Sequence, residues 1–423
     1  MLTRRNFLAA TGVGLLGTAL VRADDAKPSA RKKLAVVTTL WNYRSHAWHM
    51  AERFLHGYPW NGAWHRPEIE VVSAYVDQSP EGDLSRQRAK EFGFTIYPTI
   101  ADALRCGGSK LAVDAVLVIG EHGEYPLTDY GAKQYPRYQF FKQITDVFQK
   151  DGRVTPVFND KHLSWKFEWA KEMVDLSKSM NFPFLAGSSL PVTWRMPSID
   201  LPSGAEVEEA MCIAFGAVDI YDFHALETIQ SMLERRKGGE TGVVSMHALR
   251  GDSVWKAMSA VSWQAGGWSP RLFEACLARS QTLAQPESFS HRYPTPAQMR
   301  EWVKEPVAYR FEYADGTKAT MLLMNGLVQD FTFAATIKGQ AEPLSTLFYL
   351  PPNPNVVYSA ALMHGAETMF MTGRPPYPVE RTLLTSGLVE AGLKSLAAGQ
   401  QRLATPHLAI RYSAAREPSF FQS

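Results

Sequence analysis

The chain has 423 residues, 45% of them hydrophobic and 12% aromatic, which is enough apolar material for about two domains with buried cores. Its formal net charge is +2, and removal of residues 1–23, which hold three arginines and no acid, changes that charge to −1. This balance excludes the basic surface of nucleic-acid-binding proteins. Cys106, Cys212 and Cys276 are widely spaced and odd in number, which excludes a disulfide framework and predicts three small buried side chains.

Residues 1–23 are predicted to be an export signal. The run TRRNFL at residues 3–8 is a twin-arginine pattern, a short apolar stretch rich in Gly and Ala follows, and VRA at residues 21–23 offers small residues to a signal peptidase. A membrane anchor is the alternative, but the apolar stretch is short and interrupted by glycines. We therefore expect a periplasmic or otherwise exported protein, with a polar linker over residues 24–32 and no stable membrane span after processing.

Strand and helix patterns alternate through residues 33–190, which we predict as the first domain. Strands are expected in KLAVVTTL, IEVVSAYVDQ, FTIYP, AVDAVLVIG, TPVFNDKHLS and PFLAGSS. Helices are expected between them, among them SHAWHMAERFL, DLSRQRAKEFG, YPRYQFFKQITDVFQKDG and WKFEWAKEMVDLSKSMN. This alternation indicates right-handed βαβ units and therefore a Rossmann-like parallel sheet.

Residues 191–423 are predicted as a second domain, because the pattern changes to strand after strand through residues 306–372. Asp315-Gly316 and Asn325-Gly326 favour tight hairpin turns between these strands, since both dipeptides tolerate positive φ. Neighbouring strands joined by tight turns run antiparallel. The second domain is therefore expected to contain a largely antiparallel sheet.

The strand VAYRFEY indicates how that sheet is covered. Its aromatic residues alternate with Arg310 and an acid, which predicts one buried face and one solvated face. A helix is expected over residues 379–398, and we expect the closing segment 379–412 to pack back on the first domain. The predicted fold class is α/β, with a Rossmann-like parallel-sheet domain followed by an α+β domain.

This succession of domains resembles the Gfo/Idh/MocA family of sugar and polyol oxidoreductases, over most of the mature chain. The stretches that carry the resemblance are VVSAYVDQSPEGDLSRQRAKEFG, IYPTIADAL with VDAVLVIGEHGEYP, PVFNDKHLS where the family has E-K-P, and YPVERTLLTSGLVEAGLKSLAAGQQRLATPHLAIRY. The resemblance implies hydride transfer between a carbohydrate carbon and NAD, which an exported enzyme would hold tightly. It also implies a homo-oligomer, formed through the exposed face of the second sheet.

Two residues match the family's acid and base. Lys161 follows VFND and matches the catalytic lysine, whose ammonium group hydrogen-bonds a substrate hydroxyl; the alternative is a surface lysine at a strand end. His224 matches the histidine of the family's D-x-x-x-H segment, with Ile220 where the acid stands; the alternative is a half-buried helix histidine that is hydrogen-bonded to a neighbour. His162 replaces the proline that usually follows the lysine.

Four residues are candidates for cofactor binding at the first and second strands. Asp77 ends the second strand, where the family's acid binds the adenosine ribose and favours NAD over NADP; the alternative is a residue that starts a turn. Thr39, Asn42 and Arg44 lie where the family has G-x-G-x-x-G, and they offer a hydroxyl, an amide and a guanidinium group instead. Trp41 in the same loop either folds away or fills the pyrophosphate space.

Two further candidates, Glu121 and His122, lie in GEHGEYP at the carboxyl end of the third strand, where open α/β sheets bind ligands. They would contact cofactor, substrate or metal. The sequence has no H-x-x-H or H-E-x-x-H spacing, so we predict no metal site, although a site made from His122, His162 and His224 stays open.

Three functions are therefore compatible with the sequence. The first is an exported sugar or polyol oxidoreductase with tightly bound NAD. The second is a cofactor-free carbohydrate lyase or hydrolase in the same cleft, which the glycine-free loop favours. The third is a non-catalytic sugar-binding protein on the same scaffold.

Overall fold

The computed structural model describes residues 31–285, 293–351 and 355–422. The chain divides into the units Met1–Arg31 and Lys32–Ser423, and everything described below belongs to the second. The predicted export signal and most of the predicted linker lie outside the described residues. No helix in the described ranges combines the length and apolarity that a membrane span needs.

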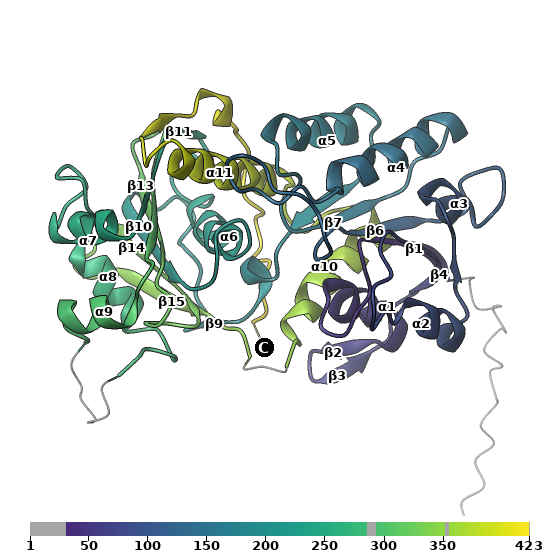
Figure 1. The fold of residues 1–423 in the computed structure, drawn as a ribbon, viewed down its shortest axis with the longest axis horizontal. Coiled ribbons are helices and arrows are strands. Elements are labelled where there is room, and N and C mark those ends of the chain that lie inside the picture. Colours follow the sequence, from purple (N-terminus) through teal and green to yellow (C-terminus); the bar gives the residue numbers. More distant parts are fainter. Residues whose placement is uncertain (1–30, 286–292, 352–354, 423) are drawn as a thin grey trace, which may run out of the picture. The chain divides into compact units, whose positions relative to one another are not determined.

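The first sheet has six parallel strands in the order β5-β4-β1-β6-β7-β8 (Figure 1). They are β1 (Lys32–Thr38), β4 (Ile69–Val76), β5 (Thr95–Ile96), β6 (Ala115–Ile119), β7 (Val157–Asp160) and β8 (Phe184–Gly187). Residues alternate between the two faces of each strand. On β1, Ala35 and Val37 therefore pack toward one face, and Leu34 and Val36 toward the other. This sheet is the predicted Rossmann-like sheet.

Helices cover both faces of this sheet. One face packs against α3 (Ile100–Arg105), α4 (Arg137–Asp151) and α5 (Phe167–Ser179). The other packs against a π-helical turn, η1 (Ala47–Ala51), and against α1 (Glu52–His56), α2 (Ser85–Phe92) and α10 (Tyr358–Thr372). The predicted strand run 306–372 was wrong for its last part, because α10 is a helix that packs on the first sheet (Figure 1).

A small hairpin is inserted between α1 and β4. It consists of β2 (Tyr58–Trp60) and β3 (Ala63–His65), and its two strands pair antiparallel. Tyr58 is fully buried, whereas Trp64 is 58% exposed. The hairpin contacts α10, so it forms part of the cover over the same face of the first sheet.

The second sheet has eight strands in the order β16-β11-β12-β13-β10-β14-β15-β9. They are β9 (Arg195–Met196), β10 (Val207–Ala214), β11 (Val243–Arg250), β12 (Val307–Tyr313), β13 (Lys318–Leu323), β14 (Phe331–Ile337), β15 (Leu344–Phe348) and β16 (Leu403–Ala404). Every pairing is antiparallel except β10 with β13. The predicted fold class, a parallel sheet followed by a largely antiparallel one, is confirmed.

One of the two predicted hairpin turns was wrong. The turn at Gly316 joins β12 to β13, which pair directly. The turn at Gly326 precedes β14, but β10 lies between β13 and β14 in the sheet. A local turn signal cannot report a strand that is inserted from earlier in the chain.

The solvated face expected at Arg310 was also wrong. One face of the second sheet packs against α6 (Tyr221–Leu233) and α11 (Glu380–Ala397), as predicted for the aromatic side. The other face is covered by α7 (Asp252–Ser259), α8 (Pro270–Leu277) and α9 (Pro296–Trp302) (Figure 1). Arg310 is buried there, and it donates to the carbonyl oxygens of Gly267 and Trp263. These helices occupy the surface through which the resemblance implied an oligomer, and the oligomer itself stays a prediction.

Helix α11 contacts α5 and α6. The hydroxyl of Ser386 accepts a hydrogen bond of 2.9 Å from the amide of Leu163, and Glu390 accepts one of 2.9 Å from the amide of Phe167. These bonds hold the segment after β7 against α11. Of the three cysteines, Cys212 and Cys276 are buried as predicted, whereas Cys106 is half-buried.

Candidate active site

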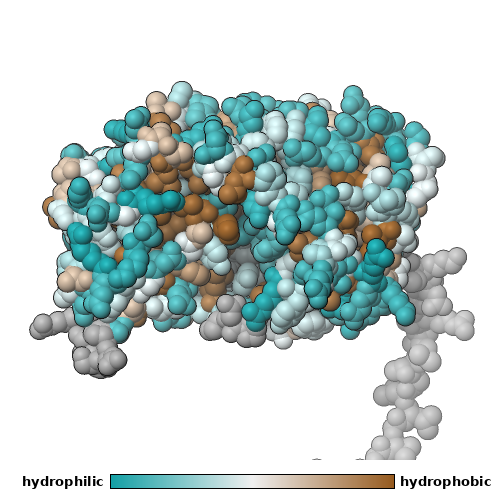
Figure 2. Space-filling view, viewed as in Figure 1, coloured by the Kyte–Doolittle hydropathy of each residue, from teal (hydrophilic) through white to brown (hydrophobic). Residues whose placement is uncertain are grey.

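A cavity of about 180 Å³ lies where the carboxyl ends of β1, β6 and β7 meet the starts of α6, β14 and α10. Figure 2 shows apolar residues gathered around the position of α6 on the viewed face. The cavity of about 180 Å³ is lined by His46, His49, Met50, Glu121, His122, Asp160, Lys161, Ser188, Ser189, Leu190, Ile220, Tyr221, His224, Phe331, Leu350 and Tyr358. A larger open depression of about 650 Å³ at the start of β10 contains none of the predicted site residues.

The structure brings Lys161 and His224 together in this cavity. Lys161 directly follows β7 and has a φ of 66°, a left-handed conformation that non-glycine residues rarely adopt. His224 lies in the first turn of α6. The Lys161 Nζ atom contacts the His224 Nε2 atom directly. The surface-lysine alternative is therefore wrong, because Lys161 is buried. His224 is a half-buried helix histidine that is hydrogen-bonded to a neighbour, so its alternative stays open and its role stays a prediction.

The surroundings of the pair favour its neutral forms. Burial lowers the pKa of Lys161, although the carboxylates of Glu121 and Asp160 oppose this shift. Burial, followed by the charge of Lys161, lowers the pKa of His224 well below its usual value. A neutral His224 accepts from Lys161 at Nε2, which leaves its Nδ1 atom without a partner among the described residues. The pair can therefore hold or release a proton beside a ligand.

A second titratable pair lies next to the first and was not predicted. The Nδ1 atom of His46 lies 2.5 Å from the Oδ2 atom of Asp160, which precedes Lys161. Burial raises the pKa of Asp160 and lowers that of His46 well below its usual value. The rings of His49 and His122 lie 4.6 and 5.0 Å from that of His46. The signal for this pair was the histidine-containing stretch SHAWH in the glycine-free loop.

Glu121 and His162 are both held by Arg137. The Arg137 guanidinium contacts the Glu121 carboxylate with one nitrogen and donates to the His162 Nε2 atom at 2.9 Å with another. Burial alone would raise the pKa of Glu121, but the charges of Arg137 and then Lys161 bring it below its usual value. Glu121 therefore lines the cavity as part of a buried ion pair.

The possible metal site made from His122, His162 and His224 finds no support in the side-chain geometry. His162 Nε2 and His224 Nε2 are each already paired with a nitrogen donor, Arg137 and Lys161 respectively. Within the described parts of the chain, these three histidines do not belong to any group with ligand atoms close enough for one ion.

Solved structures provide the comparison for this arrangement. No family model and no curated protein matches the sequence. GenD2 from gentamicin A biosynthesis, solved with NAD, matches with a TM-score of 0.55 and 13% identity over 93% of this chain and 99% of its own. Myo-inositol dehydrogenase from Lactobacillus casei, solved with NAD(H) and myo-inositol, matches with a TM-score of 0.52 and 12% identity, over 90% of this chain and 98% of its own. A probable dehydrogenase from Thermotoga maritima matches with a TM-score of 0.53 and 10% identity, over 89% of this chain and 99% of its own.

The chain has the Gfo/Idh/MocA fold. At these identities the comparisons establish the fold alone. In parallel α/β sheets, ligands bind at the carboxyl ends of the strands. The Lys161–His224 cavity lies at that edge of the Gfo/Idh/MocA fold.

The glycine-free loop of this Gfo/Idh/MocA fold is closed by its own side chains. Trp41 is fully buried, stacks on Phe94 at 5.8 Å and donates its indole N–H to Glu52, so it points into the core instead of filling the space above the loop. The hydroxyl of Ser45 accepts from the amides of Asn42 and Trp48, at 3.1 and 3.3 Å. These two amides are therefore already paired with a side chain of the same loop.

The predicted cofactor residues of the loop have different environments. The hydroxyl of Thr39 is buried and donates to the carbonyl of Glu121 at 2.5 Å, so it is not available to a phosphate. Asn42 is half-buried and donates its side-chain amide to the carbonyl of Glu81 at 3.4 Å. Arg44 is exposed, with a φ of 64°. Arg44 is therefore the cation that this loop presents to solvent.

Asp77 is exposed at the end of β4 and accepts from the hydroxyl groups of Tyr75 and Tyr125, both at 2.7 Å. Next to it, Gln78 and Glu124 are joined by two hydrogen bonds of 3.1 and 3.0 Å. These contacts connect the loop after β4 to the loop after β6. Asp77 keeps lone pairs for a further donor, because a carboxylate has about four acceptor sites.

Proposed function

We propose that the protein is an exported oxidoreductase that interconverts a hydroxyl and a carbonyl group of a sugar or polyol with NAD. The observation that carries the proposal is the direct contact between Lys161 and His224 in a buried cavity at the carboxyl edge of the parallel sheet. The names of the similar structures, an inositol dehydrogenase with NAD(H) and GenD2 with NAD, support this class of reaction and cofactor. The twin-arginine pattern supports export.

The polar atoms of the cavity favour a ligand with several hydroxyl groups. Four buried atoms have no hydrogen-bond partner in the described part of the chain: His49 Nδ1, Asp160 Oδ1, Ser189 Oγ and His224 Nδ1. Such atoms are costly unless a ligand or water pairs with them. A hydroxyl group both donates and accepts hydrogen bonds, so one polyol can pair with unpartnered donors and with unpartnered acceptors. The ring of Phe331 and the side chain of Leu190 provide an apolar wall for the carbon skeleton.

The acid–base step uses the pair as a relay. In the oxidation direction, a neutral Lys161 amine accepts the proton of the substrate hydroxyl, and the resulting ammonium group donates to His224 Nε2. In the reduction direction the same proton returns to the forming hydroxyl. NAD, when bound, would accept the hydride from the carbinol carbon or donate it to the carbonyl carbon.

The pH dependence of the reaction tests this role. Because burial lowers the pKa of Lys161 from its ordinary 10.5, kcat/KM for oxidation is expected to rise with pH through a value below 10.5, as the amine loses its proton. The reduction direction is expected to fall over the same interval. A Lys161→Arg variant keeps its charge across this range, so its residual activity should lack that limb. An identical limb in the variant would contradict the assignment.

Two residues fit NAD. The exposed Asp77 carboxylate stands at the end of β4, where it can accept from ribose hydroxyls and would repel a 2′-phosphate. The exposed Arg44 guanidinium stands in the turn after β1 and can pair with a phosphate. The capped amides of Asn42 and Trp48 do not take the part of a glycine-rich phosphate turn. We therefore propose that Arg44 holds the pyrophosphate through its side chain.

The cofactor-free function is the second candidate, and the closed loop favours it. The Ser45 cap and the Gln78–Glu124 bonds occupy groups that a dinucleotide would otherwise meet at this edge. A lyase would still use Lys161 and His224, with the amine removing a proton next to a carbonyl group and the leaving group departing with its electron pair.

The small-molecule content of the protein separates these functions. The protein purified from cells that load it before export is expected to release nearly stoichiometric NAD on denaturation, detected by mass spectrometry. Asp77→Ala should lose NAD, and Glu124→Ala, a substitution at another exposed acid, should keep it. Turnover of a carbohydrate without any nucleotide would replace this proposal by the cofactor-free one. Saccharide binding with neither nucleotide nor turnover would leave the binding protein as the function.

A further inference from the structure

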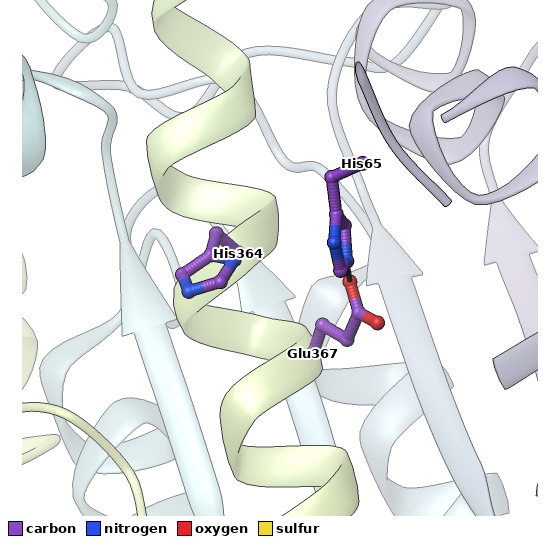
Figure 3. A group of neighbouring side chains, drawn as sticks. All are labelled: His65, His364 and Glu367. Atoms are coloured by element: carbon purple, nitrogen blue, oxygen red, sulfur yellow. Dashed lines mark hydrogen bonds and ion pairs between the residues drawn. The ribbon is translucent and has the colours of Figure 1, made fainter. Parts of the chain in front are cut away.

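A second cluster of ligand-type side chains lies outside the cavity. His65 ends the inserted hairpin, and His364 and Glu367 lie one turn apart on α10 (Figure 3). One nitrogen or oxygen atom from each residue lies within 4.8 Å of the others. Across the ranges that the structure describes, this is the one group of three histidine, cysteine or acidic residues with that property.

The separations within the cluster are close to those of a metal site. His65 Nε2 lies 2.9 Å from Glu367 Oε2, and the Tyr58 hydroxyl lies 2.6 Å from the same oxygen and 3.1 Å from His364 Nδ1. In a tetrahedral zinc site with bonds of about 2.0–2.1 Å, neighbouring ligand atoms are about 3.3 Å apart. The His65–Glu367 separation is therefore only a few tenths of an ångström shorter than this spacing, and a ligand atom of His364 lies within 4.8 Å of both residues.

Neighbouring groups hold the ligands in place. The other oxygen of Glu367 accepts a hydrogen bond of 2.8 Å from the amide of Glu68. Trp60 stacks on the ring of His364, with ring centres 3.6 Å apart. Contacts of this kind fix the orientation of ligating carboxylates and imidazoles.

Charge and access also suit a cation. The side chain of Glu367 is 6% exposed and that of His65 is 29% exposed, so the carboxylate is buried while one side of the cluster is open to solvent.

We infer that His65, His364 and Glu367 bind one zinc-type divalent ion, with a water molecule in the fourth position and the Tyr58 hydroxyl as a hydrogen-bond donor to Glu367. Two imidazoles and a carboxylate are a ligand set that zinc prefers. The ion would fasten the inserted hairpin to α10. Because α10 begins with Tyr358, which lines the cavity, the ion would also stabilise one wall of the active site.

Zinc binding by the full chain tests this inference. After treatment with a chelator, the wild-type protein is expected to take up one equivalent of Zn²⁺ in a calorimetric titration and to melt at a higher temperature with the ion than without it. His364→Gln and Glu367→Gln should each weaken binding by more than about 100-fold, since removal of outer partners alone costs 10–100-fold. Cobalt in place of zinc should give the visible absorption of a tetrahedral site.

His247→Gln is the matched control, because the His247 Nε2 atom donates to the carbonyl oxygen of Gln400 and the residue lies outside the cluster. It should bind zinc as the wild type does. The inference is overturned if the wild-type protein takes up no zinc, or if the cluster variants, folded by circular dichroism, bind it as tightly as the control. The result does not depend on NAD or turnover, so its failure is distinct from failure of the proposed oxidoreductase.

Discussion

Lys161→Met is expected to lower kcat/KM for oxidation by roughly 10²–10⁴-fold, the usual contribution of a general acid or base. Methionine keeps most of the volume of the side chain but has no group that accepts the hydroxyl proton or contacts His224 Nε2. The free energy of unfolding should fall little, because burial already disfavours the lysine charge. The assay is steady-state NAD reduction with the best substrate from a panel of sugars and polyols.

Lys171→Met is the control for this substitution. Lys171 is exposed on α5 and pairs with Asp175 at the surface, so its removal should leave kcat/KM unchanged. Equal activity of Lys161→Met and Lys171→Met would remove Lys161 from the chemistry, whichever function the protein has.

Arg137→Met is expected to have the largest effect on stability, a loss of about 3–5 kcal/mol in the free energy of unfolding. Arg137 is fully buried, and the Glu121 side chain is 5% exposed, so the variant leaves a buried carboxylate without its cation. His162 also loses the donor at its Nε2 atom. Urea unfolding, followed by fluorescence, measures the change.

A second substitution, at Glu121, separates the contribution of the Arg137–Glu121 ion pair from the other effects of losing Arg137. Arg137→Met combined with Glu121→Gln removes both charges, and the double variant should recover much of the lost stability, since an uncompensated charge is the main cost. A single variant that loses less than about 1 kcal/mol, or a double variant that loses more than either single one, would contradict this account of the ion pair.

The sequence was sufficient for the fold because its signals were local. Alternating strand and helix patterns placed the parallel sheet, and the aromatic alternation around Phe311 placed the buried face of the second sheet. The strand-end positions of Lys161 and Asp77 followed from the same patterns. The resemblance to the Gfo/Idh/MocA family singled out Lys161 and His224 as acid and base, and the structure places the two side chains in contact.

The missed features depend on contacts between distant segments. Nothing near residue 310 reports that α7, α8 and α9 cover Arg310, and nothing near residue 358 reports that α10 packs on the first sheet. Likewise, the inward direction of Trp41 depends on space beside Phe94, which comes from a different part of the chain.

The cluster of His65, His364 and Glu367 also could not be predicted from the sequence, because it joins distant segments of the chain. His65 and Glu367 are separated by 302 positions, so no short motif contains both. The spacing His364-x-x-Glu367 was the one local sign, and by itself it is common on helices. The His364-x-x-Glu367 spacing becomes part of a candidate metal site only because the inserted hairpin packs on α10 and brings His65 to Glu367.

A double-mutant cycle on Lys161 and His224 tests the central claim most directly. Lys161→Met, His224→Phe and the double variant would be compared with the wild type in kcat/KM for one carbohydrate substrate, with binding of that substrate measured separately. Residues that transfer one proton as a unit give effects that are far from additive, so the double variant should be about as slow as the slower single variant. Independent effects that multiply, or a double variant with wild-type turnover, would contradict a shared proton relay in this cavity.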